Sequence, residues 1–390
     1  MSVDFQQVMR KIREMTGQAA GKQQALLERR DLAAQLLTLK ANHLDELRTR
    51  LDQAVSANPG LRCASPLQEA LDASFPLPPM PEQVTLIAAD GSQVNPDRHG
   101  SLMYSLVNVG AIIYRHGSGA APETSITSDL KMGEEILGEG NLPNPEMVAL
   151  ERDLAERRRL LELVDGQTEP LVALTDGTLE LWGPKETRPQ AYRQALEAHL
   201  AILSRLKEKG VTVAGLVDRP TANLVLTLLE VIIAREEELG ELNHHLKLQG
   251  VSDRWLFRGL PPGHRSAVFG LQSSSRAHYQ GDLSLHFFYI NTGVEGRPSL
   301  VRVEVPAWVA QDPSQVELLQ AVIISQCRIL GDIPYPYLLH RAHELAVVTQ
   351  EDKQQVEQML AYELRQAGVE VELPSNKSRL KLMPGRRRKI

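Results

Sequence analysis

The fold of this chain is decided by Val84-Thr85-Leu86-Ile87-Ala88-Ala89-Asp90-Gly91-Ser92 and by its counterpart Leu171-Val172-Ala173-Leu174-Thr175-Asp176-Gly177-Thr178. Each is an apolar run typical of a buried strand, followed by aspartate, glycine and a hydroxyl residue. We expect each strand to end at its aspartate, because glycine lets the backbone turn sharply. Asp-Gly by itself commonly marks only a hairpin turn, so either copy alone favours a plain turn.

The two aspartates, Asp90 and Asp176, also suggest a metal site. A carboxylate at the end of a buried strand is costly to desolvate unless it has a partner. A divalent cation can serve two such carboxylates at once, and oxygen ligands suit magnesium or manganese. The repeat therefore predicts a metal-assisted enzyme, with two plain turns as the alternative.

Composition is that of a soluble globular protein, with 42% hydrophobic and 24% charged residues. The formal net charge of −6 gives no general attraction for polyanions, so a nucleic-acid substrate would need basic residues concentrated locally. Two cysteines, Cys63 and Cys327, exclude a disulfide framework and a cysteine-rich zinc site, and fit a reducing cytoplasm. Because the sequence has neither a signal-peptide pattern nor an apolar run of about 20 residues, we expect a cytoplasmic protein without a membrane segment.

Four regions follow one another along the chain. Residues 1–57, with leucines at helical spacing, predict an N-terminal helical extension, and residues 58–83 a Pro-rich linker. Residues 84–366 form the expected main domain, and residues 367–390 a basic C-terminal tail. The tail is either a solubilising end or a polyanion contact.

The main domain alternates strands and helices, which predicts an α/β fold with a mixed sheet flanked by helices. We expect strands at 84–89, 102–114, 171–175, 211–217, 283–290 and 300–305, with a polar Gly-rich loop after the second. We expect helices at 145–164, 190–209, 222–238, 314–330 and 336–365.

Further candidate ligands lie on these helices. Glu151 and Glu156 on the helix 145–164 could return to the strand ends, although glutamate on a helix is usually solvated. His340 and His343 share one face of the last helix and could bind metal or contact a phosphate, but a structural hydrogen bond is the commoner role. Asp218 ends a further predicted strand, where a local ion pair with the next residue explains it equally well.

Basic residues also crowd the helix 145–164, where they could pair with neighbouring acids or face phosphates. They are Arg152, Arg157, Arg158 and Arg159.

No phosphate-binding Walker loop, Gly-x-Gly-x-x-Gly or Gly-x-Ser-x-Gly motif occurs, which weighs against an ATPase, a dinucleotide enzyme and a serine hydrolase. The chemistry that remains is phosphodiester hydrolysis assisted by metal ions. This reaction requires acidic residues gathered at one sheet edge.

The order of these motifs resembles that of the NurA nuclease family over roughly residues 84–350. The segments that carry the resemblance are Ile87–Gln93, Arg152–Glu156, Leu174–Leu179, Asp253–Phe257, Phe287–Asn291, Val303–Pro306 and Tyr335-Pro336 leading to Ala342-His343. The resemblance implies an RNase H-like nuclease domain that depends on manganese, with magnesium as the alternative. It further implies a 5′–3′ exonuclease on single- and double-stranded DNA and a single-strand endonuclease. Such proteins act with a HerA-type hexameric ATPase in end resection at double-strand breaks, and form homodimers.

Transferred residue by residue, the resemblance places the catalytic and metal-binding positions at Asp90, Glu156, Asp176 and His343, with Glu151 as the alternative to Glu156. The second motif departs from the usual Asp-Gly-Ser, since Thr178 replaces serine but keeps a hydroxyl.

Two further motif residues, Asp253 and Tyr289, receive no chemical role from the resemblance. Two other functions stay open: a non-catalytic adaptor of a DNA translocase, and a metal phosphohydrolase acting on small molecules.

Overall fold

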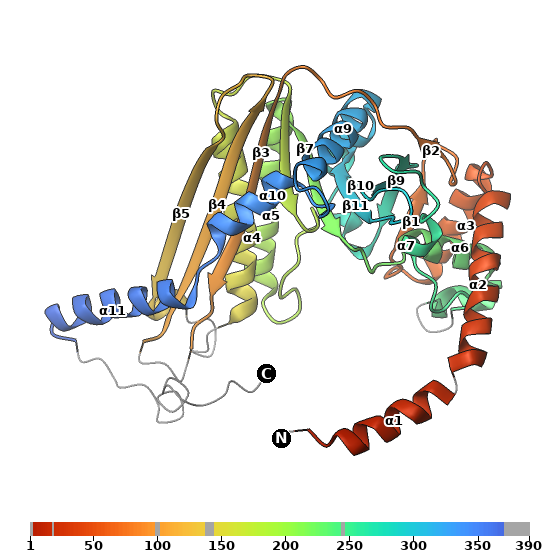
Figure 1. Cartoon of the computed structure of the whole chain (residues 1–390), viewed down its shortest axis with the longest axis horizontal. Helices are drawn as coiled ribbons and strands as arrows, with labels where there is room; N and C mark the ends of the chain where they lie inside the picture. Colours follow the sequence, from red (N-terminus) through yellow and green to blue (C-terminus); the bar gives the residue numbers. More distant parts are fainter. Residues whose placement is uncertain (1–2, 18, 98–101, 137–143, 243–245, 370–390) are drawn as a thin grey trace. The chain divides into compact units, whose positions relative to one another are not determined.

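The computed structural model in Figure 1 describes the chain except residues 1–2, 18, 98–101, 137–143, 243–245 and 370–390. Nearly all of the predicted basic tail therefore lies outside the described residues. The chain forms two compact units, which we describe separately. Unit 1 comprises Met1–Met80 and Ala214–Tyr335, and unit 2 comprises Pro81–Val213 and Pro336–Ile390.

Unit 2 is built on a mixed sheet in which β3 (Val84–Val94) is central. It pairs in parallel with β6 (Leu171–Asp176) and antiparallel with β4 (Tyr104–His116), which pairs in turn with β5 (Glu123–Met132). After β5 the chain passes through α4 before it enters β6. Two parallel strands such as β3 and β6 require a long crossover connection of this kind. The helices of this unit are α4 (Pro145–Val164), α5 (Pro189–Glu208), α10 (Tyr337–Ala346) and α11 (Gln350–Gln366), with a short 3-10 helix, η1 (Gly133–Ile136).

Both α4 and α10 pack against β3 and β4, and they cover opposite faces of the sheet (Figure 1). Residues 84–89 of β3 are all buried because both of its faces are covered. Gly110 on β4 allows α10 to approach closely: a Cβ atom there would lie 2.6 Å from the backbone oxygen of Ala342 and the backbone nitrogen of Ala346. This close approach fixes where α10 places its side chains over the sheet.

The predicted turn at Asp90-Gly91 is wrong. The strand β3 continues through both residues to Val94, and Gly91 pairs with Val109 of β4. Glycine is needed here for packing rather than for a turn, since a Cβ atom would lie 2.6 Å from Cγ of Arg152. The second turn is confirmed, because β6 ends at Asp176 and Gly177 has a φ of 91°.

Two other predictions in unit 2 differ from the structure. The polar loop expected after residue 114 contains β5, whose residues are mostly exposed and so carry no apolar strand signal. The helix expected over 336–365 is broken between α10 and α11. Thr349 caps α11 through a capping box with Asp352, which satisfies the first backbone N–H groups of a new helix.

Unit 1 contains an antiparallel arrangement in the order β1-β9-β10-β11-β7, with β8 pairing to β2 and β10. These strands are β1 (Cys63–Pro66), β2 (Ser74–Phe75), β7 (Thr212–Asp218), β8 (Arg265–Ser266), β9 (Phe269–Gln272), β10 (Leu285–Asn291) and β11 (Leu300–Pro306). Its α-helices are α1 (Phe5–Gly17), α2 (Ala19–Leu39), α3 (Leu44–Ala57), α6 (Leu224–Ile233), α7 (Asp253–Leu256), α8 (Ala307–Ala310) and α9 (Pro313–Ile329). Three 3-10 helices complete it: η2 (Glu236–Glu241), η3 (Ser274–Ala277) and η4 (Gly281–Leu283). The strand β7 begins at the end of unit 2.

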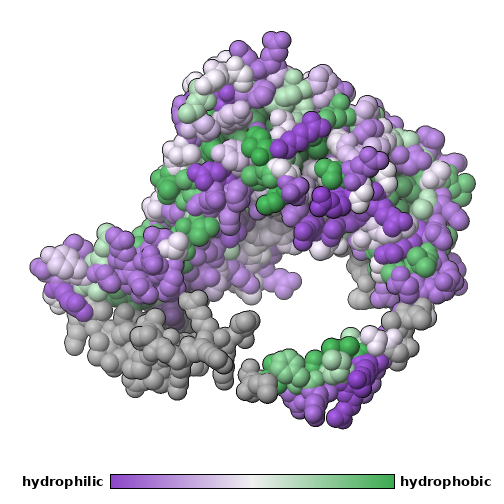
Figure 2. All heavy atoms as spheres, in the orientation of Figure 1, coloured by the Kyte–Doolittle hydropathy of each residue, from purple (hydrophilic) through white to green (hydrophobic). Residues whose placement is uncertain are grey.

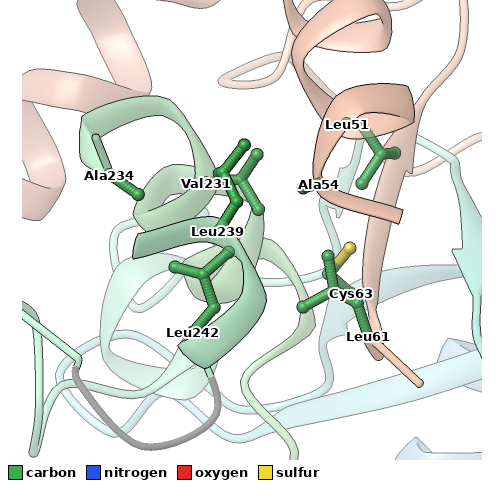
Figure 3. Close-up of a cluster of buried hydrophobic side chains, with 8 residues drawn as sticks. All are labelled: Leu51, Ala54, Leu61, Cys63, Val231, Ala234, Leu239 and Leu242. Carbon is green, nitrogen blue, oxygen red and sulfur yellow. The ribbon is translucent and has the colours of Figure 1, made fainter. Parts of the chain in front are cut away.

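The region predicted as an extension and a linker contributes to the core of unit 1. Side chains of α3 and β1 meet those of α6 and η2 in a buried cluster (Figure 3) made of Leu51, Ala54, Leu61, Cys63, Val231, Ala234, Leu239 and Leu242. Part of the segment 58–83 is therefore strand, in β1 and β2. By contrast, α1 carries its apolar side chains on one exposed face (Figure 2), with Phe5 66% and Met15 65% exposed.

None of the described helices is both long enough and apolar enough to cross a membrane.

Candidate active site

A cavity of about 360 Å³ lies in unit 2, where β3 and the end of β6 meet α4 and α10. It is lined by Asp90, Gly91, Arg152, Asp153, Glu156, Arg157, Asp176, Gly177, Thr178 and His343. All four residues that the sequence singles out as catalytic, Asp90, Glu156, Asp176 and His343, are among them. The structure therefore brings together side chains that are up to 253 positions apart in the sequence.

A hydrogen bond joins Asp90 on β3 to His343 on α10. The distance from His343 Nδ1 to Asp90 Oδ2 is 2.7 Å. The Asp90 side chain is 13% exposed and that of His343 is 61% exposed, so the pair lies at the cavity mouth with the imidazole outermost. A carboxylate bound at Nδ1 selects the tautomer that leaves Nε2 available to a ligand.

The serine of the first Asp-Gly-Ser motif holds α10 in place. Side chains two apart on a strand share a face, so Ser92 points to α10 as Asp90 does. Its hydroxyl donates to the backbone oxygen of Ala346 and accepts from the backbone N–H of Val348 at 3.1 Å. Asn108 on β4 also donates to the Ala346 oxygen, at 2.8 Å. These contacts fix the carboxyl end of α10 and thereby the position of His343.

Glu156 reaches the cavity from the opposite face of the sheet. Its Oε1 atom would lie 2.8 Å from a Cβ atom at Gly91, so the absence of a side chain at Gly91 leaves room for this carboxylate. Glu156 is only 4% exposed. Its oxygens lie 3.4 Å from Nε of Arg152 and 3.7 Å from Nη1 of Arg157.

Burial raises the pKa of Glu156 to about 8. The nearby Arg157 and Arg152 oppose this shift, whereas Asp153 and Asp90 add to it. The desolvation of the carboxyl group is the largest effect, so the two arginines do not compensate fully for its burial.

Arg157 connects α4 to the turn after β6. Its guanidinium is buried and donates to the backbone oxygen of Asp153 at 2.9 Å and to that of Thr178 at 2.8 Å. Asp176 occupies the end of β6 with an exposed side chain, and the Thr178 hydroxyl donates to the Glu180 oxygen at 2.9 Å. Threonine at the second motif therefore uses its hydroxyl within the turn.

The cavity carries an excess of acidic groups. Four carboxyl groups line it, against the guanidinium groups of Arg152 and Arg157. Within the described residues, no three His, Cys, Asp or Glu side chains already stand close enough to hold one ion. The donor set nevertheless fits a hard divalent cation, because carboxylate oxygens are the ligands that magnesium and manganese prefer. The raised pKa of Glu156 agrees with this, since a bound cation would stabilise its charged form.

Other candidates lie away from the cavity. Glu151 pairs with Lys131 at 2.9 Å and does not line the cavity, so the geometry favours Glu156 over Glu151. His340 lies 3.5 Å from Glu344 on α10 and is likewise not a lining residue. Asp218 ends β7 in unit 1, opposite Val301 of β11.

Of the four arginines of α4, two line the cavity and two do not. Arg152 and Arg157 line the cavity, whereas Arg159 bonds Glu162 and Ser125, both at 2.9 Å, and Arg158 is exposed. Asp153 is a lining residue that the sequence analysis missed. Helical spacing could have indicated it, because residues 153 and 156 lie three apart and share the face of Glu156.

The two motif residues without a predicted role, Asp253 and Tyr289, form a buried hydrogen bond in unit 1. The Tyr289 hydroxyl donates to Asp253 at 2.6 Å. The same carboxylate accepts the backbone N–H groups of Val225 and Leu226 at 2.9 and 2.8 Å, so it caps the amino end of α6. Both residues therefore serve the structure of unit 1.

Comparison with known proteins assigns a family. Residues 84–348, well over half of the chain, match the NurA domain family, which confirms the resemblance seen in the sequence. Among curated proteins, no sequence matches the chain significantly.

Solved structures similar to this chain include the NurA nuclease of Sulfolobus solfataricus, at 14% identity and a TM-score of 0.45, covering 84% of this chain and 95% of that one. Endonuclease V of Ciona intestinalis, in complex with a 24mer DNA, is 11% identical with a TM-score of 0.33, and 79% of this chain and 96% of that one are covered. The catalytic domain of human Endonuclease V is 14% identical with a TM-score of 0.32, and the coverage is 71% and 84%. The predicted α/β fold with a mixed sheet flanked by helices is confirmed by the strands and helices of the structure.

Proposed function

Because the chain belongs to the NurA domain family, we propose that it is a metal-dependent DNA nuclease whose active site is the cavity of unit 2. The observation that carries this function is the convergence of Asp90, Glu156, Asp176 and His343 on one cavity from four separate elements. A non-catalytic adaptor would have no need to keep a buried carboxylate such as Glu156 beside other acids, where its ionised form is disfavoured.

The carboxylates of Asp90, Glu156 and Asp176 would hold the metal, with His343 as a further ligand or a phosphate contact. Divalent ions bound there would activate water and stabilise the departing oxygen of the phosphodiester. Asp90 orients the His343 imidazole through Nδ1, and the exposed Nε2 can then meet a phosphate oxygen. Arg152 lies at the rim, where its partly exposed guanidinium can bind a phosphate and help to place the strand.

We assign manganese as the preferred metal, with magnesium as the alternative, on the basis of the family. The same basis supports 5′–3′ exonuclease activity on single- and double-stranded DNA, with endonuclease activity on single strands. It also supports a role in end resection at double-strand breaks with a HerA-type hexameric ATPase, a homodimeric state and a cytoplasmic location.

The test is digestion of linear DNA labelled at its 5′ end, with manganese, by the wild type and by Asp90→Ala. Glu151→Ala is the matched control, because it removes a carboxylate from α4 that lies outside the cavity. We expect the wild type and Glu151→Ala to release label and Asp90→Ala to release none. Equal inactivity of all three would favour the adaptor, and hydrolysis of nucleotides without DNA cleavage would favour a small-molecule phosphohydrolase.

A further inference from the structure

A second, larger cavity lies in unit 1, separate from the residues of the candidate active site. Its volume is about 620 Å³, and it is formed by the turn after β7, the start of α7, the β10–β11 hairpin and the end of α9 with the turn that follows. Its charged lining residues are Arg219, Arg254, Arg297, Arg328, Glu295 and Asp332. We refer to it as the arginine cavity.

All four arginines of this cavity have exposed side chains. Among the described residues, none of their guanidinium groups takes part in an ion pair or a side-chain hydrogen bond. Single exposed arginines without such a partner also occur elsewhere, as at Arg158, but here four of them line one cavity. Four arginines against two acids leave an excess positive charge, in a chain whose formal net charge is −6. Such a concentration of charge in a concave site attracts anions.

The backbone at Arg219 supports a binding role for the cavity. Arg219 has a φ of 46°, in the left-handed region that is unfavourable for a residue other than glycine. Glycine or asparagine would adopt this conformation at a lower cost. Strained residues of this kind cluster at ligand sites, where the strained conformation aims a side chain. Here it presents a guanidinium to the cavity.

The chemistry of the lining indicates phosphate oxygens as the ligand. A guanidinium binds phosphate through two parallel hydrogen bonds, and several such groups around one cavity suit several phosphates. The volume exceeds what one phosphate fills, and no aromatic side chain lines the cavity to stack a base. A duplex presents its phosphates on a rigid convex surface, whereas a single strand can bend into a concave site.

We propose that the arginine cavity binds consecutive phosphates of single-stranded DNA, without reading its sequence. This inference rests on the proposed nuclease function, since it supplies a second contact for the same polynucleotide. The cavity adds affinity for a strand rather than chemistry, because none of its lining residues belongs to the cavity of unit 2.

The test is a binding titration of the full-length chain with a fluorescent oligothymidine of about 20 nucleotides, without divalent ions. All proteins carry Asp90→Asn, so that no cleavage can occur. The test variant adds Arg254→Gln and Arg297→Gln, and the control adds Arg235→Gln and Arg115→Gln, two arginines outside both cavities. Test and control thereby have the same net charge.

We expect the test variant to bind about 10-fold more weakly than the control at physiological salt. The plot of the logarithm of the association constant against the logarithm of the salt concentration should also become less steep by about 1.4. Each phosphate contact on a single strand contributes about 0.7 to this slope, and the test variant loses two contacts. Equal affinity of test and control would overturn the inference. If the double variant does not fold, Arg328→Gln alone must weaken binding for the inference to stand.

Competition identifies the source of the phosphate. We expect inorganic phosphate and thymidine monophosphate to displace the oligothymidine only at far higher concentrations, because they offer single phosphates. Displacement by either at concentrations similar to that of the oligonucleotide would overturn the inference in favour of a small-anion site. Stronger displacement by poly-glutamate would overturn it in favour of an acidic protein partner.

Failure of this inference and failure of the proposed nuclease function give different results. If the wild type cleaves labelled DNA with manganese but test and control bind the oligothymidine equally, the arginine cavity alone is refuted. If test and control differ in binding but the wild type cleaves no DNA with manganese, the nuclease function alone is refuted.

Discussion

Replacing the buried carboxyl group in Glu156→Gln should change how the stability of the metal-free protein depends on pH. Burial raises the pKa of Glu156 from 4.5 to about 8. A carboxyl group with a raised folded-state pKa binds protons more tightly in the folded protein than in the unfolded chain. The wild type therefore loses stability as pH rises through this interval, whereas glutamine, which does not titrate, removes that loss.

The magnitude follows from the size of the shift. Each pKa unit corresponds to about 1.4 kcal/mol, so the rise to about 8 amounts to at most about 5 kcal/mol. Relative to the wild type, Glu156→Gln should gain about 1.4 kcal/mol in the free energy of unfolding for each pH unit between about 4.5 and 8. Below about pH 4.5 the difference should no longer change with pH.

The assay is urea denaturation at a series of pH values in the presence of a chelator. Glu123→Gln provides a control of opposite sign: bonding to Arg115 lowers the pKa of Glu123, so this variant should lose stability relative to the wild type as pH rises through the acidic range. Saturating manganese should reduce or reverse the advantage of Glu156→Gln, because the ion would bind the ionised carboxylate. A difference that stays constant from pH 5 to 8 in the chelator would refute the reasoning.

Two further predictions concern residues that hold the fold. Asp253→Ala should lower the free energy of unfolding by about 3 kcal/mol, because two N–H groups of α6 and the Tyr289 hydroxyl lose a buried acceptor. Tyr289→Phe, which removes only one of these hydrogen bonds, should cost about 1 kcal/mol. Both are measured by urea denaturation, and equal losses of stability in the two variants would contradict this. Gly110→Ala should destabilise by about 1–3 kcal/mol and reduce nuclease activity, since its Cβ would push α10 and His343 away from β3. Gly259→Ala, where nothing lies within 4 Å of the added atom, is the control in both measurements, and a loss equal to that of Gly110→Ala would argue against displacement of α10.

The central strands and the main helices could be predicted from the sequence because their burial leaves a pattern. The helix α4 was predicted with its observed limits, 145–164, since asparagine and proline mark its start and apolar residues recur along it. The strand β5 could not be predicted, because it is an edge strand with mostly exposed residues. The break before α11 depends on a cap at Thr349, a local hydrogen bond that outweighs the continuing helical pattern.

The candidate site shows the same division. Asp176 lies at the end of its strand, β6, as predicted. Asp90 instead lies within β3, and Gly91 provides space for Glu156 rather than forming a turn. Sequence spacing alone could not choose between Glu151 and Glu156, because that choice depends on which face of α4 meets the sheet. Motif order could not reveal that Asp253 and Tyr289 are structural, since their partner is the amino end of α6.

The most direct test of the account is the rate of DNA cleavage with manganese by the wild type, Asp90→Asn and Glu151→Gln. Each variant replaces one carboxylate by an amide of the same size, one inside the cavity of unit 2 and one outside it. We predict that Asp90→Asn loses at least about 100-fold in rate, on the scale of a lost catalytic group, and that Glu151→Gln stays close to the wild type. Full activity of Asp90→Asn would contradict the assignment of this cavity as the active site.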